Sequence, residues 1–166
     1  SDSSSMHLMR AESPGPAVGK LVPKVKTTAM ILYGIYVVFT VIEIIALLIA
    51  GMPLFDSMTL TFGTVGTGGF GLLNSSIASY STAVQIIITV FMIICSINFT
   101  VYYMFLIKRP KEALMCEEMR YYLLIVFGSA LLIAFNIRAS FASFGKAFQQ
   151  AIFQVASVIS TTGFAT

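Results

Sequence analysis

The chain has 166 residues, of which 57% are hydrophobic and only 10% are charged, with a net charge of +3. Soluble globular domains usually carry about 25% charged residues, so this composition excludes an ordinary water-soluble domain and indicates a membrane protein. The basic residues gather at the ends of apolar runs rather than on one face, which argues against nucleic-acid binding.

Residues 1–26 are predicted to form a cytoplasmic linker. Four basic residues precede the first apolar run: Arg10, Lys20, Lys24 and Lys26. A second basic band lies in residues 108–120, whereas the segment from Gly51 to Tyr80 has no lysine or arginine. Because positive charge accumulates on the cytoplasmic side of membranes, both basic segments are expected inside the cell. The serine-rich start resembles no signal peptide, so we expect a piece of a longer protein.

Three apolar runs follow the linker. They extend from Thr27 to Ala50, from Ser75 to Ile107 and from Tyr121 to Ile137. About 20 apolar residues at a rise of 1.5 Å cross the hydrocarbon core of a bilayer. We therefore predict an all-α, multi-pass protein of the cell membrane, with Glu43 as the only formal charge within a span.

A shorter helix is predicted between the first two spans, from Met52 to Phe62, followed by the glycine-rich loop Gly63 to Gly71. Pro53 suits a first helical turn, and Asp56 near that end is favourable to the helix dipole. We expect the helix to end near Phe62, where the glycines begin. Irregular backbone at membrane depth is tolerated only beside protein or a water-filled cavity, so this re-entrant segment indicates a pore.

The same order returns after the third span, where a helical stretch from Ser143 to Ser157 precedes a second loop. Superposing Thr64-Val65-Gly66 on Thr161-Thr162-Gly163 predicts a repeat of 97 residues, the difference between positions 66 and 163. The predicted domains are the linker, a complete pore repeat at 27–107, a cytoplasmic loop at 108–120, and the first half of the next repeat at 121–166. Internal repeats are common in transport proteins.

The Thr-x-Gly order in both loops is typical of cation filters. Such filters replace an ion's hydration shell by successive backbone carbonyls, and glycine permits the backbone angles that this requires. A short helix whose C-terminal end points at the loop adds about half a negative charge. Both loops are therefore predicted to bind a bare cation.

Several separate motifs resemble the Trk/Ktr/HKT superfamily of potassium transporters, in its second repeat and the first half of its third. The first loop, Thr64-Val65-Gly66-Thr67-Gly68-Gly69-Phe70, and the second, Thr161-Thr162-Gly163-Phe164, are similar to filter loops of Trk-type subunits. Further similar segments are Ala11 to Pro16, Lys20 to Pro23, Gly51-Met52, Phe55-Asp56 and Asn98-Phe99.

This resemblance implies potassium uptake through a potassium-channel-like pore of four repeats, each with a helix, a pore helix, a filter loop and a helix. It implies ion binding by six backbone carbonyls: Thr64, Val65, Gly66, Thr161, Thr162 and Gly163. It also implies a homodimer with cytoplasmic nucleotide-binding regulatory subunits, and a gate beyond Thr166. Potassium is then the substrate, and no cofactor is expected.

Three polar residues are predicted to support this pore. We expect Glu43 to accept hydrogen bonds from the pore helix or loop; the alternative, an ion or proton relay, is the default reading of a carboxylate within the membrane. Asp56 is expected at the start of the pore helix, and Asn98 is expected to bond another helix.

Other functions were weighed against potassium transport. Gly66 to Gly71 fits the dinucleotide pattern G-x-G-x-x-G, but no strand precedes it and the position about 20 residues later falls at Thr89-Val90, within an apolar run. No catalytic triad, Cys/His cluster or paired carboxylates appear, so we expect no enzyme and no metal site other than potassium. A non-conducting membrane scaffold and a sodium-permeable relative remain as alternatives.

Overall fold

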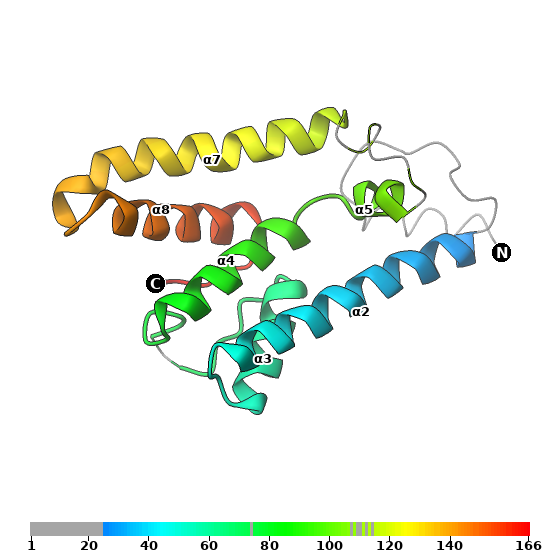
Figure 1. The fold of residues 1–166 in the computed structure, drawn as a ribbon, viewed down its shortest axis with the longest axis horizontal. Coiled ribbons are helices and arrows are strands. Elements are labelled where there is room, and N and C mark those ends of the chain that lie inside the picture. The colour runs from blue at the N-terminus through cyan, green and yellow to red at the C-terminus, as the bar shows by residue number, and fades with distance from the viewer. Residues whose placement is uncertain (1–24, 74, 107, 109–110, 112, 114) are drawn as a thin grey trace.

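The computed structural model describes residues 25–166 except 74, 107, 109, 110, 112 and 114, and every regular element in this part is a helix. The elements are α2 (Val25–Ile49), α3 (Leu54–Val65), α4 (Thr82–Cys95), α5 (Phe99–Leu106), α7 (Glu117–Ile137), a 3-10 turn (Arg138–Ser140) and α8 (Phe144–Ile159), as Figure 1 shows. The predicted all-α membrane fold is confirmed, whereas most of the predicted linker lies outside the described residues.

Two of the helices are long and apolar enough to cross a membrane unaided. These spans are Ala29–Ile49 in α2 and Glu117–Ser140, which comprises α7 and the turn after it. Both present large apolar side chains outward, among them Ile45 on α2 and Leu132 on α7. In water such surface would be unfavourable, but it suits contact with lipid tails or with other helices of a membrane protein.

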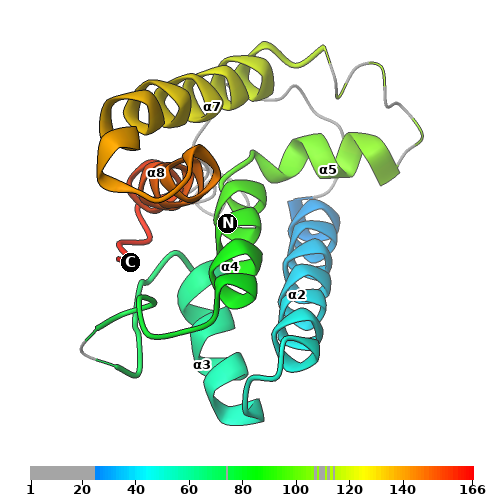
Figure 2. The same ribbon diagram turned by 60° about the vertical axis from the view of Figure 1, so that its left-hand side comes forward.

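The second predicted span, by contrast, is not one straight helix. Its halves α4 and α5 are bent by 84° at residues 96–98, and Figure 2 shows α5 turning away from α4. The apolar composition predicted the segment but concealed the bend. The cause lies in Asn98, whose Oδ1 accepts a hydrogen bond from the backbone N–H of Thr100 at 3.0 Å and so caps the start of a new helix.

Two tyrosines bond carbonyls beside the bend, of which that of Ile94 also accepts a hydrogen bond from the backbone N–H of Ile97 at 3.1 Å. Tyr102 donates from its hydroxyl to the carbonyl of Ile94 at 2.6 Å, and Tyr122 on α7 donates to that of Ile93 at 3.2 Å. An unpaired carbonyl at membrane depth costs several kcal/mol. The two hydroxyls therefore stabilise the bend and tie it to the next repeat.

The two short helices pack between the longer ones. Helix α3 lies against α2 and α4, while α8 runs antiparallel beside α7 and also touches α4 (Figures 1 and 2). One apolar cluster includes Leu47 and Leu60 from the first repeat together with Phe153, Ala156 and Phe164 from the second. The two predicted repeats consequently share a core rather than forming independent units.

A glutamine cluster joins the same two repeats on the other side of α4. Gln85, which is 8% exposed, donates from Nε2 to the carbonyls of Tyr80 and Ile77 at 3.2 and 3.4 Å. Its Oε1 accepts from Gln149 and Gln150 of α8 at 3.2 and 3.4 Å. Because buried amides and carbonyls are costly without partners, these bonds fix α8 relative to the segment that follows the first loop.

Candidate ion pathway

The first short helix extends three residues beyond its predicted end. Helix α3 includes Thr64 and Val65, and Gly66 is its C-terminal cap. The hydroxyl of Thr64 donates to the carbonyl of Leu60 at 2.8 Å, which keeps this last turn hydrogen-bonded. The expectation that glycines end the helix near Phe62 is wrong because Gly63 is buried within α3. Tertiary packing there outweighs the low helix propensity of glycine.

Both loops leave their helices through the same three backbone hydrogen bonds. In the first loop they run from Gly66 N to Phe62 O at 3.1 Å, from Thr67 N to Thr64 O at 3.1 Å, and from Gly69 N to Gly63 O at 3.1 Å. In the second they run from Ser160 N to Ala156 O at 2.9 Å, from Thr161 N to Val158 O at 3.1 Å, and from Gly163 N to Ser157 O at 3.3 Å. Each position in the first loop corresponds to the one 94 residues later.

The backbone angles agree with this spacing. Thr67 and Thr161 have φ values of 51° and 58°, and Gly69 and Gly163 have values of 65° and 85°. The predicted repeat of 97 residues is therefore wrong by three. Thr67-Gly68-Gly69-Phe70 corresponds to Thr161-Thr162-Gly163-Phe164. The Gly-Phe pair that both segments share already indicated this alignment.

The predicted ion-binding residues accordingly fall into two groups. Thr64 and Val65 are helical, and the carbonyl of Thr64 accepts the Thr67 N–H. Thr161, Thr162 and Gly163 lie in the second loop. Over the described part of the chain, no hydrogen bond reaches the carbonyls from Val65 to Gly69 or from Thr161 to Gly163. These carbonyls are therefore available to an ion, whereas that of Thr64 is already engaged.

The two loops touch each other directly. A Cβ atom added to Gly69 would lie 1.9 Å from the carbonyl oxygen of Thr162. One added to Gly63 would lie 3.0 Å from the carbonyl oxygen of Phe70 and 3.1 Å from the ring of Phe164. The two loops, nearly a hundred positions apart in the sequence, thus pack against each other.

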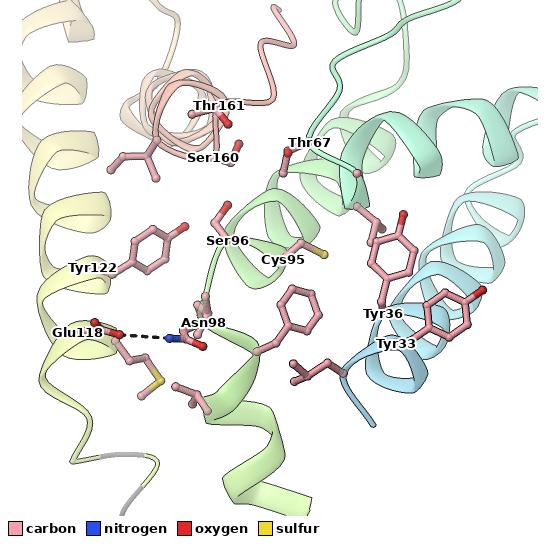
Figure 3. A pocket seen from close by; sticks show the side chains of 18 residues that line it. Tyr33, Tyr36, Thr67, Cys95, Ser96, Asn98, Glu118, Tyr122, Ser160 and Thr161 are labelled. Carbon is pink, nitrogen blue, oxygen red and sulfur yellow. Dashed lines mark hydrogen bonds between the residues drawn. The ribbon is translucent and has the colours of Figure 1, made fainter. Parts of the chain in front are cut away.

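A cavity of about 1180 Å³ opens where the two short helices end. At the C-terminal ends of α3 and α8 the cavity is lined by a set of residues that we call its roof: Val65, Gly66, Thr67, Ile159, Ser160 and Thr161. Figure 3 shows Glu118 and Tyr122 of α7 on one side and Tyr36 of α2 on the other, with Ser96 and Asn98 of the bend between them. Each helix C-terminus contributes about half a negative charge, so the roof of the cavity favours a cation.

Of the three predicted support residues, only Asn98 lines the cavity. Glu43 is fully buried beside the Thr64 hydroxyl, but neither carboxylate oxygen has a hydrogen-bond partner among the described residues, so the expected bonds from the pore helix or loop are not formed: the Thr64 hydroxyl donates to the Leu60 carbonyl instead. Asp56 lies in the first turn of α3 and is half-buried. Asn98 donates from Nδ2 to Oε2 of Glu118 at 3.4 Å, which links the bend to α7. Glu118 itself was not among the predicted residues, because nothing in the apolar run from Ser75 to Ile107 indicated the bend that it faces.

Comparison with known proteins agrees with this architecture. All 166 residues match the sequence profile of the TrkH family, described as a cation transport protein. The chain is 34% identical to the Trk system potassium uptake protein TrkH of Vibrio parahaemolyticus, over 97% of this chain and 35% of the relative. Identity is also 34% to TrkH of Escherichia coli K12, and it is 28% to TrkG of that strain, over 97% and 96% of this chain and 34% of each relative.

The chain is also similar to a solved structure. The crystal structure of the potassium transporter TrkH from Vibrio parahaemolyticus matches with a TM-score of 0.83 at 30% identity, over 95% of this chain and 35% of that one. The chain spans about a third of the length of these relatives.

Proposed function

This chain belongs to the TrkH family of cation transport proteins, and from that premise we propose that it supplies two of the filter strands through which a Trk-type subunit takes up potassium. The chain is a membrane protein and not an enzyme, since its relatives are named as transporters. One observation carries the proposal: two short helices end at the same cavity in loops that share three backbone hydrogen bonds and have successive carbonyls without a hydrogen bond in the described part of the chain.

We assign the second filter strand to Thr161, Thr162 and Gly163, as the sequence predicts. For the first strand, the repeat of 94 residues favours Thr67, Gly68 and Gly69 in place of Thr64, Val65 and Gly66. Successive carbonyls of these residues would replace the water around a monovalent cation. Val65 and Gly66, which line the cavity, would then meet the ion below the filter.

The surrounding architecture follows from the same proposal. Residues 27–107 would form a complete pore repeat, 108–120 a cytoplasmic loop, and 121–166 the first half of the next repeat. Homodimerisation, regulation by a cytoplasmic nucleotide-binding subunit and preference for potassium over sodium remain predictions for the complete protein. A scaffold of packed helices would have no need of two loops with the same hydrogen bonds, which favours transport over that alternative.

The direct test is ion uptake by the complete subunit that contains this chain. In cells that lack their own potassium uptake systems, its expression should restore growth at low external potassium, and radioactive rubidium, a potassium analogue, should enter faster than radioactive sodium. Equal entry of both ions would instead support a sodium-permeable transporter. Failure of a well-expressed, membrane-inserted subunit to carry either ion would support a scaffold.

The buried carboxylate provides a second test within the same assay. We expect Glu43→Gln to lower the amount of folded transporter several-fold while leaving the ratio of potassium to sodium uptake unchanged. The side chain is fully buried beside Thr64, where the new amide N–H groups need acceptors, and Glu43 is not among the residues that line the cavity. The measurement compares the monodisperse transporter recovered in detergent with uptake per molecule. An altered ion ratio at normal yield would instead place Glu43 in an ion relay.

A further inference from the structure

One acidic side chain in the cavity has no part in the filter. Among the described residues that line the cavity, Glu118 is the only one with a formal charge. The side chain is half-buried and projects toward the bend between α4 and α5 (Figure 3). The field inside the cavity is consequently negative, from this carboxylate together with the ends of α3 and α8.

The Glu118 carboxylate is also held in place. Asn98, which caps α5, donates to its Oε2 at 3.4 Å, and the neighbouring Tyr122 on α7 is fixed by its bond to the Ile93 carbonyl. An amide donor orients a carboxylate without neutralising it. The bond to Asn98 occupies one lone pair of the carboxylate and leaves the others open to an ion that enters the cavity.

A purely structural role for Glu118 would be a simpler explanation of its position than a role in ion entry. Acidic residues in the first turn of a helix are stabilised by the helix dipole, and both Glu117 and Glu118 occupy the first turn of α7. Glu117 meets that need equally well, but it is exposed and does not line the cavity. The dipole thus explains an acidic residue at this helix end, but not the position of the second one inside the cavity.

We propose that Glu118, oriented by Asn98, is an attraction site for hydrated monovalent cations in the cavity beneath the filter. Hydroxyls of Ser96, Ser160 and Thr161 also line the cavity, so a hydrated cation drawn in by Glu118 finds further polar groups between it and the filter. This inference rests on the proposed function and adds to it a residue that sets how readily cations enter from the side of the cavity. By the positive-inside rule, that side is the cytoplasm.

The test measures rectification of the complete transporter reconstituted in planar bilayers with potassium chloride on both sides. At low ionic strength, Glu118→Gln should reduce the current that enters from the cavity side by roughly two- to fivefold relative to the opposite current. The reduction should vanish at high ionic strength, because salt screens the charge. A current ratio does not depend on how many molecules have folded.

Two further variants complete the test. Glu118→Asp, which keeps the charge, should retain most of the wild-type ratio, and the matched control Glu117→Gln should leave it unchanged. An unaltered ratio in Glu118→Gln, or an equal change in Glu117→Gln, would overturn the inference while leaving the proposed function intact. A wild-type transporter without potassium current would contradict the proposed function itself.

Discussion

Replacing Gly69 by alanine in the complete transporter should reduce potassium uptake by roughly tenfold or more, through two effects. The first is conformational: Gly69 has a φ of +65°, which costs a residue with a side chain about 1–2 kcal/mol. The second is steric, because the added Cβ would lie 1.9 Å from the carbonyl oxygen of Thr162. That oxygen belongs to the proposed second strand, so one methyl group in the first loop displaces ion ligands in both.

The expected change is in conduction and selectivity more than in folding. Rubidium and sodium uptake should be measured per correctly folded molecule, with the yield taken from size-exclusion chromatography in detergent. Gly71→Ala is the matched control, since it lies two residues further along the same loop and its added Cβ would come no closer than 3.7 Å to another atom. Normal uptake and selectivity in Gly69→Ala would remove Gly69 from the filter and would favour the originally predicted strand from Thr64 to Gly66.

The apolar runs allowed the sequence to predict the membrane fold, and the glycines marked the loops that follow the two short helices. A run of some twenty apolar residues has few alternatives in a bilayer, and the glycine-rich loop is too short and broken to cross it. Helices α2 and α7 therefore lie where they were expected. The bend at Asn98 was missed because the apolar run around it is unbroken. The bend depends on a local cap, the bond from the Thr100 N–H to Asn98, and on a contact between segments, the bond from Tyr122 of α7 to the Ile93 carbonyl.

The register of the first loop shows a different limit of sequence reasoning. Thr64-Val65-Gly66 and Thr67-Gly68-Gly69 are both Thr-x-Gly triplets, three residues apart, and local chemistry alone does not distinguish them. The choice depends on where α3 stops, which in turn depends on the packing of Gly63. Only the three-dimensional contacts, with matching hydrogen bonds in both loops, favour the later triplet.

Close packing around Gly63 is also the reason for the second substitution from which we expect a large effect. We expect Gly63→Val to destabilise the transporter by about 1–3 kcal/mol, the usual cost of overfilling a packed site. The Cβ alone would approach the carbonyl oxygen of Phe70 to 3.0 Å and the ring of Phe164, which is 1% exposed, to 3.1 Å. Two further methyl groups have no room, so either the first loop or Phe164 must move. Uptake should fall together with the melting temperature of the purified protein.

The control for this variant is Gly34→Val, a glycine in the middle of α2 with no atom within 4 Å of an added Cβ in the described chain. Both substitutions replace a helical glycine by the same residue, so their effects on helix propensity are similar and the difference in melting temperature reports the packing alone. Gly63→Ala should give an intermediate result, because a single methyl group requires the Phe70 carbonyl and the Phe164 ring to shift by only a few tenths of an ångström. Equal melting temperatures for Gly63→Val and Gly34→Val would mean that the two loops do not support each other through Gly63, and the shared core of the repeats would then have to depend on contacts elsewhere.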